Sequence, residues 1–329
     1  MIPRAARGQI ATMMALLCLA NVLIWAWAGY AFHARPALLG TALLAWVFGL
    51  RHAVDADHIA AIDNVVRKLV QNGRRAWDSG FFFALGHSAT VLILCLGIIA
   101  FPSMHGIARP REAADAWGTW FSAGFLLMIG MANLLTLPRL WRARRGGSFE
   151  VASAGGVMSR VLRPVQRLVG RTWHMVPVGF LFGLGFDTAS EVALLVLTAQ
   201  QAAAGLSMSD VLVFPAMFTA GMVLMDTADS AVMTGAYGWA LREPARRLGY
   251  NIVVTALSVF VAVGVGGFEL VGLLAAHAGS AIGHAPFGTR MLNAMDLAGP
   301  FAGFAVVAVL LLLWGGAALA LRLWPKVAE

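Results

Sequence analysis

The chain has 329 residues, of which 60% are hydrophobic and only 12% are charged. Soluble globular domains carry about twice that fraction of charged residues, so the composition excludes an ordinary soluble enzyme or binding domain. The net charge of +8 comes from basic residues between the hydrophobic stretches. Basic residues in such loops set the orientation of a membrane protein, so we do not expect a nucleic-acid partner. Both cysteines, Cys18 and Cys95, lie in hydrophobic stretches, so the sequence predicts neither a disulfide framework nor a zinc finger.

Hydrophobic stretches of roughly 20 residues recur along the chain and indicate an all-α polytopic membrane protein. We expect a single transmembrane domain over residues 1–329. The first stretch follows a short basic segment and is long enough to span, so we expect a retained helix and not a cleaved signal peptide. The eight predicted spans are 10–32, 37–62, 78–101, 118–138, 176–203, 210–235, 250–276 and 299–323.

The basic residues are distributed unequally between alternate loops. If the N-terminus is cytoplasmic, 19 of the 24 Lys and Arg residues fall in cytoplasmic segments and four in external ones, with Arg51 inside a span. The positive-inside rule therefore predicts that both termini are cytoplasmic. The longest cytoplasmic loop, 139–175, is basic, and we interpret it as a topology-setting segment that contacts membrane lipid, with a regulatory role left open.

The first span contains one amide, Asn21, in an otherwise apolar run. A buried amide usually forms a hydrogen bond with a neighbouring helix, which is the structural interpretation that we favour. It could also contact an ion or steady a ligand histidine without touching the ion.

The second span carries the sequence Arg-His-Ala-Val-Asp-Ala-Asp-His-Ile at 51–59. Charged and ionisable side chains are costly in a membrane and are usually functional there. Two imidazoles and two carboxylates form a nitrogen and oxygen ligand set suited to a divalent first-row transition metal. The four candidate ligands are His52, Asp55, Asp57 and His58. The alternative, in which Arg51 only neutralises the aspartates, leaves the two histidines unexplained.

The geometry of a straight helix limits this hypothesis. At about 100° per residue, His52, Asp55 and His58 share one face, whereas Asp57 points away. Either Asp57 has another role, or the helix is broken at the motif, as transporter helices often are near their binding sites.

The third span contains Gly86-His87-Ser88. Gly86 would let another backbone approach closely, and His87 is a third imidazole within the membrane. The sequence leaves open whether His87 is a metal ligand, a proton carrier or a core residue with a hydrogen-bond partner.

The fifth and sixth spans each carry two carboxylates. Asp187 and Glu191 are four residues apart, and Asp226 and Asp229 are three apart, so each pair shares a helical face. Thr188 lies beside the first pair. Because carboxylates do not face lipid, we expect both pairs to line the interior of the bundle and to form a second tier along the ion pathway.

A short internal repeat links the second and fifth spans. Phe48-Gly49-Leu50 and Phe182-Gly183-Leu184 precede Asp57 and Glu191 by the same spacing. The predicted topology gives these two spans opposite directions. Inverted repeats with a site near the midplane are a common transporter plan, and the predicted halves are 37–140 and 176–276.

These four motifs, in this order, closely resemble those of the nickel/cobalt transporter family, a group of eight-span secondary permeases. The family motif His-x4-Asp-His is matched by His52, Asp57 and His58. Three further motifs of the family are matched by residues 83–88 (Phe-x-x-Gly-His-Ser), 184–191 (Leu-Gly-x-Asp-Thr-Ala-x-Glu) and 221–229 (Gly-Met-x-x-x-Asp-Thr-x-Asp). One position departs from the family pattern: Ala89 stands where the family more often has Thr. This difference affects the packing around His87.

The resemblance implies high-affinity, low-capacity uptake of Ni²⁺ or Co²⁺ across the bacterial cytoplasmic membrane, with the metal as substrate and with no prosthetic group. It also implies supply of the metal to enzymes such as urease, hydrogenase or cobalamin-dependent enzymes. The chain has no Gly-x4-Gly-Lys-[Ser/Thr] motif, so it does not hydrolyse ATP by itself, and no ATPase subunit is implied. Transport driven by membrane potential or protons fits.

Two other classes are weighed against this one. A membrane metalloprotease would show His-Glu-x-x-His, which is absent, and a desaturase would need more clustered histidines than the eight present. A related metal exporter would be favoured by a histidine-rich cytoplasmic loop, but segment 139–175 contains only His174. We therefore predict a transporter and not an enzyme, and the sequence alone does not fix the direction of transport.

Overall fold

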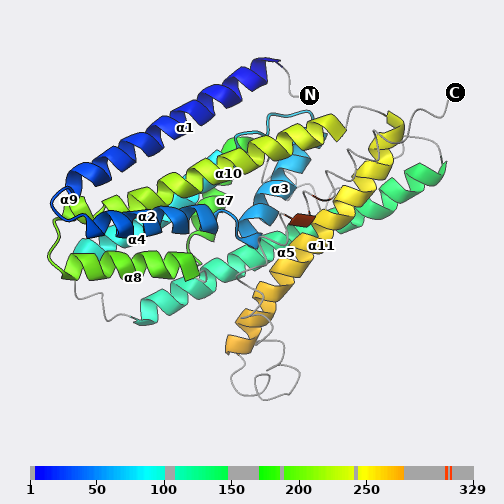
Figure 1. Cartoon of the computed structure of the whole chain (residues 1–329). Coiled ribbons are helices and arrows are strands. Elements are labelled where there is room, and N and C mark those ends of the chain that lie inside the picture. Colours follow the sequence, from blue (N-terminus) through cyan, green and yellow to red (C-terminus); the bar gives the residue numbers. More distant parts are fainter. Residues whose placement is uncertain are drawn as a thin grey trace.

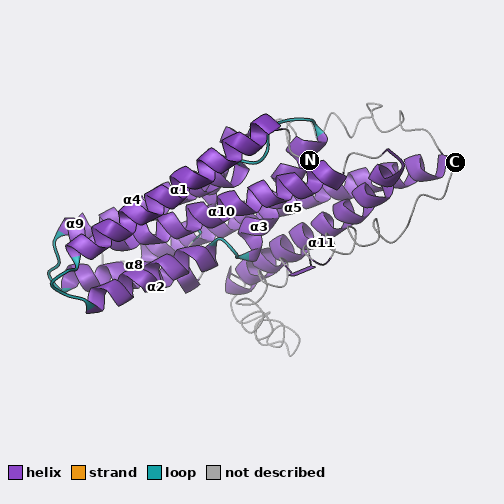
Figure 2. Cartoon of the chain, turned by 45° about the horizontal axis from the view of Figure 1, so that its top comes forward, coloured by secondary structure: helices purple, strands orange, loops and turns teal. Residues whose placement is uncertain are grey.

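The computed structural model describes residues 4–100, 108–146, 170–185, 189–240 and 244–277, together with positions 308, 309 and 312. Within these residues all regular structure is helical (Figures 1 and 2). Figure 1 shows an elongated bundle with α1 along its outer edge and with α5 crossing α11.

The described helices are α1 (Arg4–Ala31), α2 (Ala37–His52), α3 (Ala56–Gln71), α4 (Ser79–Ala100), α5 (Ala108–Gly146), the 3-10 helix η3 (Thr172–His174), α7 (Met175–Phe182), α8 (Ala189–Ala203), α9 (Met208–Val211), α10 (Val213–Ala240) and α11 (Pro244–His277).

The helical segments agree with a multi-pass membrane protein. Four are long and apolar enough to cross a membrane, and the bent pair α2–α3 passes the same test as a fifth. The four are Ala6–Ala31, Ser79–Ala100, Met208–Gly238 and Thr255–Leu274. The predicted span 118–138 lies within α5, where the apolar stretch Thr119–Leu135 is shorter. Apart from three positions, the span 299–323 falls outside the described residues, so eight spans stay a prediction.

The second predicted span is broken at its polar motif. α2 ends at His52, α3 begins at Ala56, and the two axes are bent by 49°. Asp55 has an extended backbone and starts α3, so the helical path that would have turned Asp57 away is interrupted here. Of the two alternatives that helix geometry left open, the structure has the broken helix.

The second helix of this bent pair continues beyond residue 62, the predicted end of the span. α3 continues to Gln71 because Val65, Val66 and Leu69 extend its apolar packing. Arg67, which the predicted topology assigns to a cytoplasmic loop, is instead buried within the bundle.

The fifth predicted span is also interrupted. α7 ends at Phe182, and α8 begins at Ala189 after a turn at 183–185. Asp187 and Thr188 lie outside the described residues, so their predicted positions stay untested. The predicted loop 139–175 begins inside α5, which extends to Gly146, and residues 147–169 also lie outside the described part.

The helix α2 packs closely against α10. A Cβ atom placed at Gly49 would lie 2.0 Å from the carbonyl oxygen of Phe218, and one at Gly221 would lie 2.6 Å from that of Trp46. Only glycine permits two helix backbones to approach this closely.

A crossing of the same design joins α7 to α4. A Cβ atom at Gly179 would lie 2.0 Å from the carbonyl oxygen of Phe83, and one at Gly86 would lie 1.9 Å from that of Val176. This crossing makes Gly179 the equivalent of Gly49. The sequence repeat had selected a different glycine, one helical turn later in the chain.

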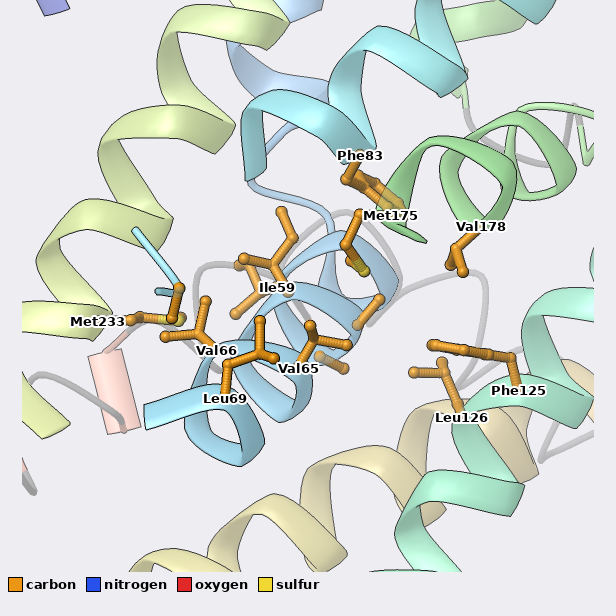
Figure 3. Packing of buried hydrophobic residues seen from close by; sticks show 14 of the residues in the cluster. Ile59, Val65, Val66, Leu69, Phe83, Phe125, Leu126, Met175, Val178 and Met233 are labelled. Carbon is orange, nitrogen blue, oxygen red and sulfur yellow. The ribbon is translucent and has the colours of Figure 1, made fainter. Parts of the chain in front are cut away.

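Two apolar clusters fill the bundle on either side of the α2–α3 break. One surrounds α3, and Figure 3 shows Ile59, Val66 and Leu69 of this helix among side chains that include Phe125 and Met233. The other joins α1, α2, α8 and α10. The polar residues at the break therefore lie between two apolar regions.

Candidate metal site

Three imidazoles meet where α2 gives way to α3. His52 is the last residue of α2, His58 lies in the first turn of α3, and His87 comes from α4. Their ring centroids are 4.5 to 4.8 Å apart, and each side chain is at most 2% exposed. Each residue offers a nitrogen atom, and these atoms lie within 4.8 Å of one another. This is the only such group of three or more potential metal ligands in the part of the chain that the structure describes.

A carboxylate from the other half of the chain joins the histidines. Glu191 Oε1 lies 2.7 Å from His87 Nε2 and 3.5 Å from His52 Nε2, and the two Nε2 atoms are 2.9 Å apart. Two ring nitrogens and one carboxylate oxygen thus converge on a small buried volume. Imidazole and carboxylate are ligands that suit divalent first-row metals.

The other ring nitrogen of His52 is held by polar groups. Its Nδ1 lies 3.3 Å from Ser190 Oγ and 3.4 Å from Asp55 Oδ2. Contacts of this kind fix the orientation of a ligand imidazole. Ser190 was not among our predicted site residues. Its place in the first turn of α8 becomes visible only once the fifth span is known to be interrupted.

His58 faces a second carboxylate, which belongs to α10. His58 Nδ1 lies 3.4 Å from Asp226 Oδ2, and both side chains are fully buried. Neither residue has a hydrogen-bond partner among the described residues. Buried polar atoms normally have partners because leaving them unsatisfied costs free energy. A cation bound here would satisfy both groups.

Two of the predicted carboxylates stand further from the imidazoles. Asp57 is half-buried in the first turn of α3 and makes no ion pair within the described ranges, although its charge acts on His58. Asp229 has a buried Oδ2 atom without a described hydrogen-bond partner, and its charge interacts with that of Asp226. Neither residue belongs to the group of three histidines, but the charge of each acts on a residue of the site.

Two further predicted residues adjoin the site in sequence. Ser88 follows His87 and is buried, and its hydroxyl has no hydrogen-bond partner in the described part of the chain. Arg51 precedes His52 near the end of α2 and is half-buried.

Asn21 joins three helices. Its amide nitrogen donates hydrogen bonds to the carbonyl oxygens of Leu17 and Ala220, and its oxygen accepts one from Trp46 Nε1 at 2.9 Å. These contacts fasten α1 to α10 and α2. They agree with the structural interpretation of Asn21, since none of them reaches a ligand histidine.

Broken helices that bring imidazoles and carboxylates together inside an apolar helical bundle are typical of multi-pass membrane proteins that carry ions. Comparison with known families then narrows the assignment. Residues 38–320 match the NicO family, described as high-affinity nickel-transport protein. The chain belongs to this family, which confirms the resemblance seen in its motifs.

Relatives cover most of the chain. It is 46% identical over 312 residues to the hydrogenase nickel incorporation protein HupN of Bradyrhizobium diazoefficiens, which is 91% of this chain and 80% of that protein. It is 47% identical over 281 residues to the high-affinity nickel transport protein of Cupriavidus necator, with 82% and 80% covered. It is 38% identical over 345 residues to the cobalt transport protein NhlF of Rhodococcus rhodochrous, with 98% and 95% covered. No solved structure matches the chain.

Proposed function

We propose that the protein is a secondary transporter that imports Ni²⁺, Co²⁺ or both across the cytoplasmic membrane of a bacterium. The observation that carries this proposal is the buried group of His52, His58 and His87 between two apolar clusters. The family match and the two relatives named as nickel and cobalt transport proteins support it.

The ligand set favours nickel or cobalt. Imidazole nitrogens and carboxylate oxygens without thiolate suit these ions and argue against Cu(I). We assign direct contact with the ion to the three histidines, Glu191 and Asp226.

The remaining site residues take supporting roles in the proposal. Asp55 orients His52. Asp57, Asp187 and Asp229 attract the cation or carry protons along the pathway. Arg51, Ser88 and Thr188 position these groups, and Asn21 fastens α1 to α10 and α2.

Membrane potential or protons would drive the transport. Two positive charges moving inward gain roughly 4–5 kcal/mol per 100 mV, about three decades of accumulation. This driving force requires neither a prosthetic group nor an ATPase subunit. We assign the basic segment 139–175 to the cytoplasmic face, where it would contact lipid headgroups.

Alternating access would come from two inverted halves, 37–140 and 176–276. The matched glycine crossings of α2 on α10 and of α7 on α4 support this arrangement. The helix directions support it too. Figure 1 shows α2 and α10 both beginning near α9, so these two helices run in the same direction. α10 runs opposite to α4, since Gly80 faces Asp226 and Trp77 faces Ser230.

The direction of α7 follows from its contacts with α4. α7 runs alongside α4 in the same direction, because Gly179 lies against Phe83 and Gly183 lies against Thr90. α2 and α7 therefore run in opposite directions, as inverted repeats require.

Uptake of radioactive nickel and of radioactive cobalt tests the proposal in a host that lacks its own transporters for these metals. Cells producing the protein should accumulate at least one of the two metals, and dissipating the membrane potential should reduce the uptake. The His52→Ala variant, produced to the same level in the membrane, is the matched control. If correctly inserted protein takes up neither metal, the proposed function is wrong.

A further inference from the structure

A second buried polar group lies on α3, beyond the metal site. Every residue from His58 to Arg67 is at most 3% exposed. A helix on the surface of a bundle buries only one face. α3 is instead surrounded, with contacts to α4, α5, α10 and α11, and Figure 3 shows its apolar side chains filling the space between these neighbours.

Asp63 ties α3 to two other helices. Its Oδ1 atom accepts a hydrogen bond from the hydroxyl of Tyr237 on α10. Its Oδ2 atom accepts one from Ser258 Oγ on α11 at 3.0 Å. Both oxygens of a buried carboxylate are therefore satisfied by neutral hydroxyl groups.

Arg67 ties the next turn of α3 to α11. Its Nη1 atom donates a hydrogen bond to Thr255 Oγ1 at 3.0 Å, and its Nη2 atom lies 3.4 Å from Asn64 Oδ1. Nε has no partner, and no carboxylate in the described ranges forms an ion pair with this buried guanidinium. The opposite charges of Asp63 and Arg67 nevertheless interact.

This geometry offers α3 two arrangements. Asp63 and Arg67 are four residues apart, the spacing at which an acid and a base pair directly on one helix face. In the observed arrangement, each binds hydroxyl groups of α10 or α11. If α3 moved away from α10 and α11, the carboxylate and the guanidinium would lose those hydroxyls and could pair with each other, so neither charge would be left buried without a partner.

We propose that Asp63, Arg67, Tyr237, Thr255 and Ser258 form an inner latch, which holds α3 across the transport path and opens once per transport cycle. Gating elements of this kind need two discrete arrangements of similar free energy. The latch rests on the proposed transport function and on the orientation that places the basic end of α3 in the cytoplasm. It assigns roles to residues that the metal site does not use.

The test measures access to α3 from the cytoplasmic side. Cys18 and Cys95 are changed to Ala, and Ala61, which is fully buried on α3, is changed to Cys. A membrane-impermeant maleimide is then added to inside-out vesicles without metal. Tyr237→Phe and Ser258→Ala should each raise the labelling rate at least tenfold. Ser122→Ala, which removes a buried hydroxyl of α5 that has no described partner, should leave the rate unchanged.

A second measurement needs no latch variant. The Ala61→Cys protein should label faster during Ni²⁺ turnover under an imposed potential than at rest, and Ni²⁺ binding to the purified protein should stay within about twofold of the parent. The latch is refuted if Ni²⁺ is transported while labelling of the Ala61→Cys protein stays at the resting rate, or if both latch variants label like the parent. Failure of both variants to fold would mark the network as structural and would also overturn it. If Ni²⁺ binds normally and both latch variants raise the labelling rate, but no Ni²⁺ is taken up, the proposed function and not the latch is contradicted.

Discussion

The segments α2–α3 and α7–α8 are built alike but carry different chemistry. Each consists of two helices separated by a short break, and each packs its first helix against the other half of the chain through a glycine crossing. α2 ends with His52 where α7 ends with Phe182, and the third residue of α3 is His58 where that of α8 is Glu191. The two segments therefore share the glycine crossing of the first helix, but they carry different side chains on either side of the break.

The two halves of the chain supply different kinds of side chain to the candidate site. All three imidazoles come from the first half, and the two carboxylates that contact them through α8 and α10 come from the second. In the proposed metal site, neutral nitrogens would select the kind of metal, whereas carboxylates would offset the charge of a divalent ion that has lost its water. We expect that neither half binds the ion alone.

Removing a ligand from the first half should have the largest effect. Loss of a supporting contact to a metal ligand typically costs 10- to 100-fold in affinity, so loss of a ligand should cost at least about 100-fold. Alanine at His52, His58 or His87 should therefore abolish nickel uptake and weaken Ni²⁺ binding to the purified protein by that factor. His33→Ala is the control, because His33 is exposed. Parental affinity in all three variants would refute the histidine site.

Acidification should weaken binding for the same reason. A metal-bound imidazole must be neutral, so protons compete with the ion, and up to one proton is displaced for each histidine ligand. An ordinary imidazole titrates near pH 6.5. Ni²⁺ affinity measured by titration calorimetry should fall from pH 8 to pH 5, by up to about tenfold per pH unit for each proton displaced. An affinity that stays flat over this range would argue against imidazole ligands.

Neutralising the second half should have a smaller effect than removing a histidine. Glu191→Gln and Asp226→Asn retain size and an oxygen atom that can still face the ion, and they remove only the charge. Each should therefore reduce Ni²⁺ affinity by less than a lost histidine, about 10- to 100-fold, while both together should reduce it further. Asp210→Asn on α9, away from the site, is the matched control. If both amide variants bind and transport like the parent, the carboxylates are structural, and the division of work between the halves fails.

The two glycine crossings should respond alike if the halves are equivalent. Gly49→Ala and Gly179→Ala each place a Cβ atom 2.0 Å from a backbone carbonyl oxygen, which the helices can relieve only by moving apart. Each should lower stability by about 1–3 kcal/mol, the usual cost of overpacking. Thermal unfolding in detergent measures this, with Gly40→Ala as the control because nothing lies within 4 Å of its Cβ position. A large loss at only one of the two crossings would contradict their equivalence.

The smallest expected effect concerns Ser190, whose hydroxyl contacts His52 from the second half. Ser190→Ala should reduce Ni²⁺ affinity by roughly tenfold or less, at the low end of what losing a group that orients a ligand costs, because the imidazole keeps its contact with Asp55. Thr198→Val, a buried hydroxyl of the same helix that bonds within α8, serves as the control. Equal affinities in the two variants would show that Ser190 does not orient the histidine.

The sequence singled out three histidines that the structure brings together, but it did not show where the helices around them break. Histidines and carboxylates in apolar segments stand out because membranes rarely tolerate them without a function. On α3 the predicted topology placed Arg67 in a cytoplasmic loop, whereas Asp63 and Arg67 are both buried in the bundle. Their charges are satisfied by hydroxyl groups on helices distant in sequence, and no local pattern reveals such partners.

The internal repeat in the sequence and the helix contacts in the structure pair different glycines. Three identical letters, Phe-Gly-Leu, selected Gly183, but the register of two packed helices depends on where backbones touch. That contact places Gly179 opposite Gly49. Ser190 was missed because its position depends on the interruption after Phe182, which a continuous apolar stretch conceals.

The complete burial of α3 has a consequence for how the protein is made. Tyr237 and Ser258, which bind Asp63, lie 174 and 195 residues further along the chain. At about 5–20 residues per second, the ribosome needs roughly ten seconds or more to produce them after α3 has emerged. During that interval Asp63 and Arg67 have each other as partners on α3. We therefore expect α3 to settle into the bundle last, after α10 and α11 have been inserted, although it is among the first helices to be synthesised.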